Sequence, residues 1–419
     1  MKKKVAFFLD NSNLLDKDYT CIVNGNPGVG GSEYEFLLVS YLLDQRQNGI
    51  ECVLLHNSKI ELPHTLHVYI DNLGSACKYC QTHGINTLVI DIKSFNKITL
   101  DKYCQGIDIV LWLHNSATYS SLNLFNKLPY IKKLVNVGRE QLELYRDHMA
   151  TLKSTYIYNI IPIKEKSFYL SKMGDRNNHN VVYMGSLVPG KGFHLLAQVW
   201  KNVLKRVPDA QLYVVGSGKL YNSNAKLGKY GFAEESYEEK FMPYITDENG
   251  VILQSVHLMG VMNEDKYELL GKCKVGIPNP TGVSETFCIC GLEMQLMGCN
   301  ITTLYHPAYL DTIYNKSSLY KDPDQLVEYI INRLLTNNDN YDDLYDFVSK
   351  TFNAENSISK WERLFHDFDS NVVEPISDNN YQLKKVKNVL FTLKRRCPIF
   401  KIIPPIACFV NVLNLIKLK

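Results

Sequence analysis

The sequence predicts an α/β protein with two Rossmann-like domains that face each other across a cleft. The chain of 419 residues is too long for one ordinary hydrophobic core, because domains usually contain about 100–200 residues. In both halves, short apolar runs alternate with amphipathic segments, which is typical of parallel strands and the helices that connect them. A polar stretch at 164–180 lies between the halves and is typical of a linker.

We expect the first domain over residues 1–163. Its first buried strand is the apolar run Val5–Leu9, which is followed by a glycine-rich loop and a helix over 32–47. Later apolar runs, each bounded by polar residues or glycine, predict the other parallel strands: 52–55, 87–92, 107–113, 133–137 and 156–161.

The second domain is expected over residues 181–356. It begins with a strand at 181–184, and a long helix follows Gly192, with apolar positions spaced three and four apart. Further apolar runs predict strands at 212–215, 257–259, 275–278 and 301–304. Residues 357–380 predict a closing helix and a linker to the tail.

The N-terminus and the cysteines favour a cytoplasmic protein. Asp10 interrupts the first apolar run, which is therefore shorter than the h-region of about 7–15 residues that a secretory signal needs. The eleven cysteines show no disulfide framework, so we expect reduced thiols. Cys77 and Cys80 form a single CxxC pair without a second pair of ligands, and no metal site is predicted there.

The tail, residues 381–419, differs in charge from the rest of the chain. It holds nine Lys and Arg and no Asp or Glu, whereas the remainder holds 37 basic and 43 acidic residues. Apolar residues at helical spacing lie among these cations, which predicts an amphipathic helix on an anionic membrane surface rather than a nucleic-acid-binding segment. A helix packed on the body of the protein is the alternative. The apolar positions are Leu383, Val386, Leu390 and Leu393.

The glycine-rich loop at 24–32 excludes a P-loop NTPase. It matches the glycine spacing of that motif, but Gly31 stands where the phosphate-binding lysine is required. The glycines still allow backbone amides to approach a phosphate or a sugar, and Ser32 and Glu35 fit a capping box that begins a helix. A simple turn between a strand and a helix is the alternative for this segment.

Two further segments carry charged residues suited to a nucleotide. Lys191 lies between glycines just before the long helix, where a diphosphate can be bound. Glu285 and Glu293 lie eight positions apart, the first on a loop and the second inside a helix, and a carboxylate can accept two hydrogen bonds from a diol such as ribose. The Gly216-Ser-Gly218 turn lacks the third glycine of a dinucleotide-binding loop.

Together these segments resemble glycosyltransferase family 4, whose members have the GT-B fold. The resemblance covers about residues 1–370 and is strongest over 181–303, where several motifs agree in order and spacing. The matching segments are Gly30-Gly31, GSLxxxKG at 185–192, VVGSG at 214–218, HLMG at 257–260 and Glu285-x7-Glu293.

The resemblance implies a role for each matching residue. Glu285 would contact hydroxyls of the donor sugar, Glu293 the ribose and Lys191 the diphosphate, while His114 would approach the reacting sugar. The first domain would take the acceptor and the second the nucleotide sugar. The remaining implied donor contacts are Gly30, Gly31, Ser186, Gly260, Val261, Phe287, Cys288 and Ile289.

Two departures from the family stand out. Ser186 occupies a position where many members have arginine, which puts the diphosphate contacts in question. Cys288 replaces a common glycine but keeps its amide donor. The resemblance further implies transfer with retention, no cofactor or metal, a glycan or lipid-linked acceptor, and a role in cell-surface polysaccharide or glycolipid assembly at the inner face of the membrane. A nucleotide-sugar epimerase of the same fold and a non-catalytic binding subunit are the alternatives.

Overall fold

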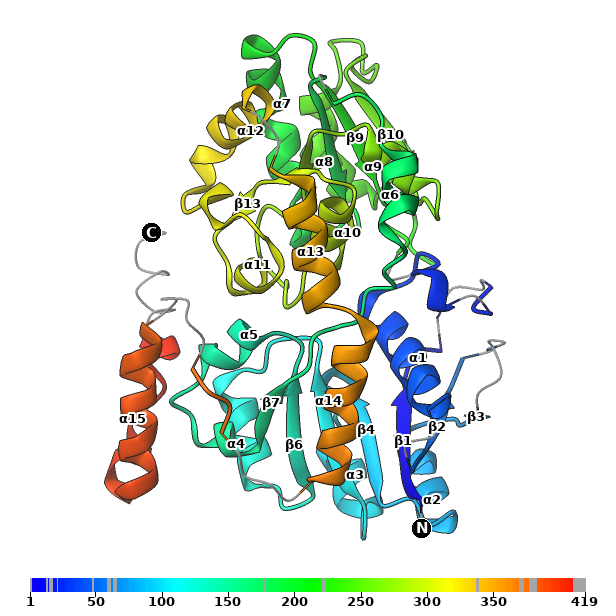
Figure 1. Ribbon diagram of the computed structural model, residues 1–419, viewed down its shortest axis with the longest axis vertical. Helices are drawn as coiled ribbons and strands as arrows, with labels where there is room; N and C mark the ends of the chain where they lie inside the picture. Colours follow the sequence, from blue (N-terminus) through cyan, green and yellow to red (C-terminus); the bar gives the residue numbers. More distant parts are fainter. Residues whose placement is uncertain are drawn as a thin grey trace. The chain divides into compact units, whose positions relative to one another are not determined.

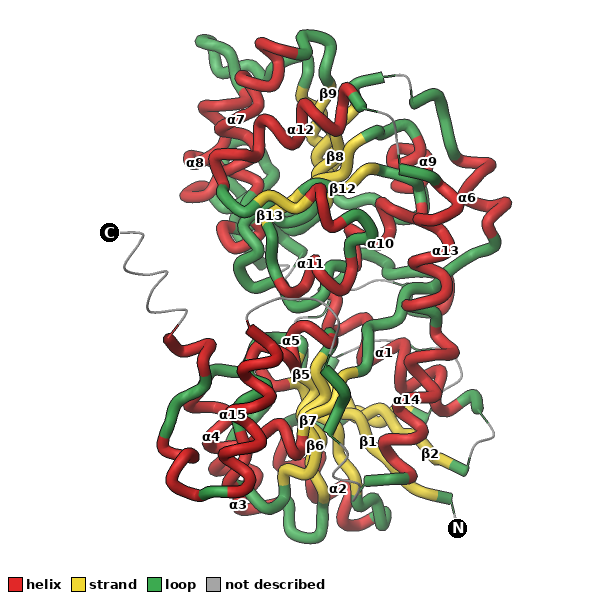
Figure 2. Tube along the Cα trace, turned by 60° about the vertical axis from the view of Figure 1, so that its left-hand side comes forward, coloured by secondary structure: helices red, strands yellow, loops and turns green. Residues whose placement is uncertain are grey.

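The computed structural model describes residues 2–12, 14, 18–20, 22–46, 49–58, 62, 66–176, 178–220, 224–336, 339–368, 373–376 and 383–409. The chain forms two compact units, the first from 1–12, 35–160 and 355–419 and the second from 13–34 and 161–354. Each unit contains a parallel sheet with helices around it (Figures 1 and 2). The predicted α/β class is therefore confirmed, while the cleft stays a prediction.

The first unit is built on a seven-stranded parallel sheet with the order β3-β2-β1-β4-β5-β6-β7. The strands are β1 Lys3–Leu9, β2 Ile50–His56, β3 His67–Tyr69, β4 Thr87–Asp91, β5 Asp108–Leu113, β6 Ile131–Asn136 and β7 Ser154–Tyr156. The helices are α1 Gly31–Asp44, which begins in the second unit, α2 Leu73–Thr82, α3 Lys97–Tyr103, α4 Tyr119–Lys127, α5 Arg139–Leu144, α14 Ala354–His366 and α15 Lys384–Arg396. Short 3-10 helices are η2 Ile92–Ser94, η3 Met149–Lys153 and η8 Pro398–Ile402.

The closing helix α14 belongs to the core of the first unit. Trp361 on α14 is fully buried, and its ring lies 5.6 Å from that of Phe7 on β1 and 4.9 Å from that of Trp112 on β5. Edge-to-face aromatic packing of this kind joins elements that are far apart in the sequence. The last part of the chain therefore completes the first unit.

The second unit contains a five-stranded parallel sheet with the order β10-β9-β8-β11-β12 and a separate pair, β13-β14. The strands are β8 Asn180–Met184, β9 Gln211–Val215, β10 Val256–Gly260, β11 Val275–Ile277, β12 Asn300–Ile301, β13 Thr303–Leu304 and β14 Leu319–Tyr320. The helices are α6 Lys166–Lys172, α7 Phe193–Arg206, α8 Glu235–Ile245, α9 Lys266–Gly271, α10 Ile289–Leu296, α11 Pro307–Thr312, α12 Leu326–Leu335 and α13 Tyr341–Thr351, with 3-10 helices η1 Ile22–Asn24, η4 Pro189–Lys191, η5 Lys316–Ser318 and η6 Pro323–Gln325.

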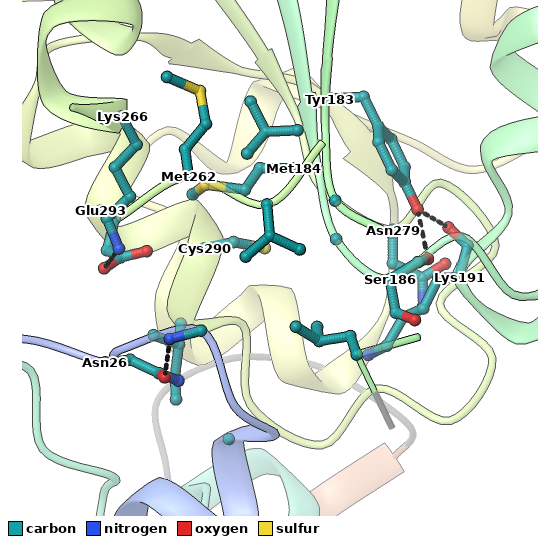
Figure 3. Close-up of a pocket in the computed structure, with 18 of the residues that line it drawn as sticks. Asn26, Tyr183, Met184, Ser186, Lys191, Met262, Lys266, Asn279, Cys290 and Glu293 are labelled. Carbon is teal, nitrogen blue, oxygen red and sulfur yellow. Dashed lines mark hydrogen bonds and ion pairs between the residues drawn. The ribbon is translucent and has the colours of Figure 1, made fainter. Parts of the chain in front are cut away.

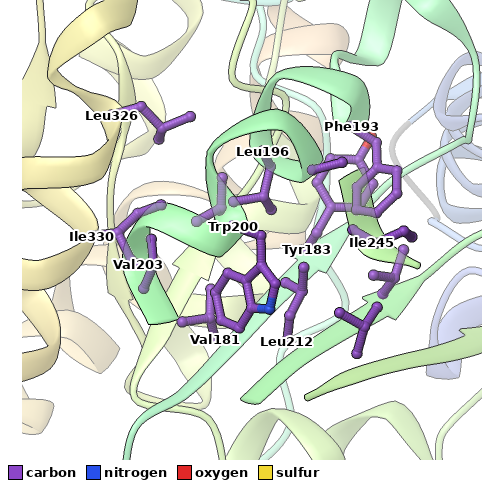
Figure 4. Packing of buried hydrophobic residues seen from close by; sticks show 14 of the residues in the cluster. Val181, Tyr183, Phe193, Leu196, Trp200, Val203, Leu212, Ile245, Leu326 and Ile330 are labelled. Carbon is purple, nitrogen blue, oxygen red and sulfur yellow. The ribbon is translucent and has the colours of Figure 1, made fainter. Parts of the chain in front are cut away.

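Helix α7 confirms the periodicity seen in the sequence. Leu196, Trp200 and Val203 lie on one face of the helix and are fully buried. Figure 4 shows them packed among Val181 of β8 and Ile330 of α12. Burying a large apolar side chain contributes about 1.5–3 kcal/mol, so this one face fixes α7 on the sheet.

The unit boundaries differ from the expected domains in two places. Residues 13–34 group with the second unit rather than with the rest of 1–163. The expected linker at 164–180 contains helix α6, where Tyr169 is fully buried and its ring lies 5.8 Å from that of Tyr267. A buried aromatic side chain within a polar stretch holds this segment against α9, so it is part of the second unit.

Glu35 is not the capping residue that the sequence suggests. Both of its carboxylate oxygens accept the backbone N–H of Ile160 at 3.0 Å, and the side chain is fully buried. Burial raises the pKa of Glu35 well above its usual value, although the hydrogen bond from Ile160 opposes this. The glutamate ties α1 to Ile160, the last residue of the 35–160 stretch of the first unit.

The tail helix α15 packs on the first unit with three of its four lysines inward. Lys384, Lys387 and Lys394 are at most 3% exposed, so the expectation that they face a membrane is wrong. The physical reason is that buried carboxylates of the body provide partners for these lysines, as described below. Residues 381–382 and 410–419 of the predicted tail lie outside the described residues. Within the described ranges, no helix has both the length and the apolar character needed to span a bilayer.

Candidate functional site

A pocket lies at the carboxyl ends of the strands of the second unit (Figure 3). Loops that follow β8, β9, β10 and β11 line it, together with α10 and part of the glycine-rich loop. In open parallel sheets, ligands bind at this edge, where the loops converge. The sheet therefore explains why motifs spread over more than 250 residues meet in one place.

The loop after β8 places Lys191 at the pocket. Tyr183 donates a hydrogen bond from its Oη to the backbone oxygen of Lys191 at 2.9 Å, which holds the loop against the strand (Figure 3). Gly192 has a φ of 69° and precedes α7, and a Cβ added to it would lie 2.4 Å from Cγ2 of Thr281. Only glycine fits this backbone position, so the Lys-Gly pair has a steric basis.

The Gly216 turn is required by the close approach of two loops. A Cβ at Gly216 would lie 1.8 Å from the backbone oxygen of Gly185, so no other residue fits without movement of the backbone. Next to it, the Oγ of Ser186 donates to the backbone oxygen of Ser217 at 3.2 Å. The hydroxyl of Ser186 thus joins the loops after β8 and β9.

Glu285 is held against Lys191. The Nζ of Lys191 lies 2.8 Å from Oε2 of Glu285, and these side chains are 17% and 9% exposed. Ser284 before it has a φ of 58°, an uncommon backbone conformation for a residue other than glycine. Asn279 braces both loops, because its Nδ2 donates to the backbone oxygens of Gly190 at 3.1 Å and Val283 at 2.9 Å.

Glu293 is paired with a lysine that the sequence did not single out. The Nζ of Lys266, on α9, lies 2.6 Å from Oε1 of Glu293, on α10, and these side chains are 9% and 10% exposed. Both residues line the pocket. Figure 3 shows this pair on one side of the pocket and Lys191 on the other. The pocket therefore has two separate Lys–Glu pairs.

If the pocket binds a nucleotide, as the sequence predicts, Lys266 should contribute to that binding. Lys266→Met would remove a positive charge that lines the pocket, so we expect binding of a nucleoside diphosphate to weaken about ten- to 150-fold, the equivalent of ~1.5–3 kcal/mol for a hydrogen bond to a charged group. Isothermal titration calorimetry would measure the change. Lys272→Met, at an exposed lysine just after α9, is the matched control. Tighter binding by the Lys266→Met variant would show instead that the lysine competes with the ligand.

The glycine-rich loop packs on α10 within the second unit. The Oδ1 of Asn26 accepts the backbone N–H groups of Gly28 and Val29 at 2.8 Å, which fixes the turn. A Cβ on Gly31 would lie 3.4 Å from Cδ1 of Ile289, so the loop contacts the start of α10. The loop was expected to act from the first domain; it instead lines the pocket as part of the second unit.

Most of the predicted donor contacts line this pocket. Gly30, Gly260 and Cys288 are not among its lining residues, and Cys288 is 1% exposed. Residues that line it without having been predicted include Asn26, Lys266 and Asn279. The predicted residues that do line it are Gly31, Ser186, Lys191, Val261, Glu285, Phe287, Ile289 and Glu293.

His114 lies in the first unit, after β5, and is paired with Asp91 at the end of β4. Its Nδ1 lies 2.8 Å from Oδ2 of Asp91, and both residues are buried. Burial acts to raise the pKa of Asp91, but hydrogen bonds and charges from His114 and Lys93 together outweigh it, and the pKa is lowered. A carboxylate at Nδ1 fixes the orientation of the ring. Asp91 was not predicted.

The CxxC pair is part of the core. Cys77 and Cys80 are fully buried on α2, and burial raises the pKa of each thiol to about 12. Thiols of this kind are protonated and unreactive. Among the described residues, no cluster of three or more His, Cys, Asp or Glu is placed to hold a metal ion.

Part of the second unit matches a family of known proteins. Residues 172–350 match the model of a family described as glycosyl transferases group 1. An uncharacterized glycosyltransferase of Haemophilus influenzae is 28% identical over 150 residues, which cover 34% of this chain and 40% of that protein. The match thus spans less than half of the length of this relative.

Solved structures are similar over most of the chain. A glycosyltransferase from Rickettsia africae has a TM-score of 0.60 at 12% identity, and the match covers 88% of this chain and 100% of the other. The catalytic domain of starch synthase IV from Arabidopsis thaliana, bound to ADP and acarbose, has a TM-score of 0.55 at 11% identity. The match covers 88% of this chain and 99% of the other. Residues 172–350 therefore resemble a group 1 glycosyl transferase domain, in a chain with the GT-B fold.

Proposed function

We propose that the protein is a retaining glycosyltransferase of family 4 that moves a hexosyl group from a nucleotide-diphosphate sugar to an acceptor hydroxyl. The observation that carries this proposal is the presence of both predicted glutamates, each paired with a lysine, in one pocket of the group 1 domain. The starch synthase with the same fold is bound to ADP and acarbose, which supports a nucleotide donor and a glycan acceptor for this chain.

The two Lys–Glu pairs are suited to bind the two ends of a nucleotide-sugar donor. We assign the ribose to Glu293 and the diphosphate to Lys191, because Figure 3 shows these residues on different sides of the pocket. When the diphosphate binds to Lys191, Glu285 would lose its contact with this lysine and would accept hydrogen bonds from hydroxyls of the sugar. Charged and polar groups held in place before the reaction stabilise the charge that develops on the leaving diphosphate.

The proposed step is a transfer on one face of the sugar. The bond between C1 and the β-phosphate oxygen breaks while the acceptor oxygen bonds to C1 from the same side. The hydroxyl proton passes to the departing phosphate, so no carboxylate nucleophile is required. Lys191 and the amino-terminal end of α10 would supply positive charge, and we therefore expect no metal or other cofactor. His114, oriented by Asp91, is the proposed contact to the reacting sugar.

The proposed setting is the assembly of a cell-surface polysaccharide or glycolipid in the cytoplasm, with the protein at the inner face of the membrane. The support is the part of the tail that stays exposed, whose apolar side chains and remaining cations suit an anionic membrane surface and a lipid-linked acceptor.

Two other functions compete with this one. A nucleotide-sugar epimerase of the same fold would release nucleotide without an acceptor, and a non-catalytic subunit would bind the donor without turnover. A thermal-shift screen of nucleotide sugars would identify the donor, because a bound ligand raises the apparent stability.

The donor so identified then gives the decisive measurement. We expect nucleoside diphosphate to be released only when an acceptor hydroxyl is supplied, with the new glycosidic bond in the anomeric configuration of the donor, as read by NMR. Acceptor-independent release would support the epimerase, and binding without any release would support the subunit.

A further inference from the structure

The inner face of α15 is charged. The Nζ of Lys384 lies 2.6 Å from Oε1 of Glu140, and Lys387 donates to the backbone oxygens of Glu143 at 3.2 Å and Leu144 at 3.0 Å. These lysines are at most 3% exposed. Burial lowers the pKa of Lys387 to about 8, which agrees with its removal from water.

The second half of the helix is held in the same way. Lys394 donates from its Nζ to the backbone oxygen of Asp147 at 2.8 Å, and the carboxylate of Asp147 accepts the backbone N–H of Ile406 at 2.8 Å. Phe391 lies between these contacts and is 3% exposed. The basic residues that suggested a membrane in the sequence are thus partly used to attach the helix to the first unit.

The outer face of α15 is apolar. Val386, Val389 and Leu393 recur on the side of the helix away from the buried lysines and are 53%, 61% and 40% exposed. The 3-10 helix η8 packs against α15 and adds further exposed apolar side chains. We call this set the outer apolar face: Leu383, Val386, Val389, Leu393, Ile399, Ile402, Ile403 and Phe409.

The exposed positive charges around the outer apolar face favour an anionic lipid surface as its partner. Four exposed cations accompany it, and the sequence from 381 to 419 contains no Asp or Glu. A second copy of the chain would bring these cations against one another, whereas an anionic lipid surface complements them and accepts the apolar side chains. The exposed cations are Lys385, Arg395, Arg396 and Lys401.

We propose that the outer apolar face inserts into an anionic bilayer while the buried lysines attach α15 to the body. This deepens the membrane location that forms part of the proposed function. It changes the role expected of the lysines. Val386 and Leu393 insert as the sequence predicts and Val389 joins them, whereas Lys384, Lys387 and Lys394 attach the helix to the body instead of contacting lipid. It also fixes one face of the first unit toward the lipid, where a lipid-linked acceptor would be presented.

The test uses the full-length chain and vesicles of phosphatidylcholine with phosphatidylglycerol, without any donor. We expect the Val386→Ser/Val389→Ser/Leu393→Ser variant to sediment with vesicles at least 100-fold more weakly than the unmodified chain. Each removed side chain accounts for about a five-fold loss, because these side chains are about half exposed and would newly bury about half of the area of a Val or Leu side chain. The melting temperature of this variant should change little, because the removed side chains are partly exposed.

Matched controls separate the outer face from general surface effects. Ile98, Leu170 and Val251 are 82%, 49% and 61% exposed outside the tail, and their triple serine variant should bind vesicles like the unmodified chain. Lys385→Ser/Lys401→Ser should weaken binding to the anionic vesicles and leave binding to pure phosphatidylcholine unchanged.

Three outcomes would overturn the proposal. Unchanged vesicle binding by the tail triple variant would exclude insertion of this face. Dimers in light scattering that the triple variant abolishes would assign the face to a second copy. Binding that increases when residues 410–419 are removed would show that this segment covers the face. Because vesicle binding is measured without donor or acceptor, failure here leaves the transferase proposal intact, and failure of acceptor-dependent transfer leaves the membrane result intact.

Discussion

The Glu285→Gln variant is expected to turn over about ten- to 150-fold more slowly than the unmodified protein, because a hydrogen bond to a charged group contributes ~1.5–3 kcal/mol. The proposed contact of Glu285 is with the donor sugar, so kcat should fall while the affinity for a nucleoside diphosphate without sugar is maintained or increases. An increase has a structural basis. Loss of the negative charge 2.8 Å from the Nζ of Lys191 would make that ammonium more available to phosphate.

Lys191→Ala should weaken binding of the diphosphate part of the donor. The unmodified protein should prefer a nucleoside diphosphate over its nucleoside, and this variant should lose most of that preference. Because Lys191 and Glu285 touch each other, the effects of their single variants should not add in the double variant, and a coupling energy of about 0.5–3 kcal/mol is expected.

Steady-state kinetics and calorimetry on the two single variants, the double variant and Glu239→Gln would measure both effects. Glu239 is exposed on α8 and serves as the matched control. Wild-type kinetics in the Glu285→Gln variant, or equal affinity of the unmodified protein for nucleoside and diphosphate, would remove the basis of the site assignment.

The sequence predicted the structure correctly where a local residue pattern reflects a packing or steric requirement of the fold. The apolar spacing of α7 predicts its buried face, and Gly192 and Gly216 occur where the structure leaves no room for a Cβ. Glu285 and Glu293, which the order of several motifs over 181–303 singled out, both line the pocket. For the helix and the glycines the information lies within a few residues, whereas for the two glutamates it lies in a pattern of motifs along the second half of the chain.

The partners of these residues could not be predicted in the same way. Lys266 meets Glu293 only because α9 packs near α10, and Asp91 meets His114 only because β4 and β5 are neighbours in the sheet. These pairs depend on which elements are neighbours in the folded protein. The residues next to a single lysine or aspartate in the sequence do not indicate its partner. The same holds for the glycine-rich loop, which the sequence assigns to the first domain and the structure to the second unit.

The orientation of α15 shows a related limit. Its periodicity correctly separates an apolar face from a basic one, but the usual rule that lysine stays exposed points the basic face outward. The deciding factor is a set of carboxylates more than 200 residues earlier, among them Glu140 and Asp147, whose side chains are fully buried. Their burial makes lysine the complementary residue on the inner face.

Lys384→Met is therefore expected to destabilise the first unit strongly. It would leave the Glu140 carboxylate, whose side chain is 0% exposed, without the ammonium that lies 2.6 Å away. Removing one partner of a buried ion pair costs about 3–5 kcal/mol. For a unit of this size that corresponds to a fall in melting temperature of about 6–20 °C, measurable by differential scanning calorimetry.

The neighbouring lysine provides a control that differs by one position along the helix. Lys385 is exposed, so Lys385→Met should leave the melting temperature nearly unchanged. The double variant Lys384→Met/Glu140→Met should recover most of the lost stability, because replacing both partners of a buried pair with apolar residues is often neutral. Recovery would show that the loss of the ammonium beside the Glu140 carboxylate, and not the loss of helix packing, is responsible. If Lys384→Met melts like the unmodified chain, α15 is not attached through this ion pair, and the inward orientation of its lysines, on which the outer apolar face depends, would have to be abandoned.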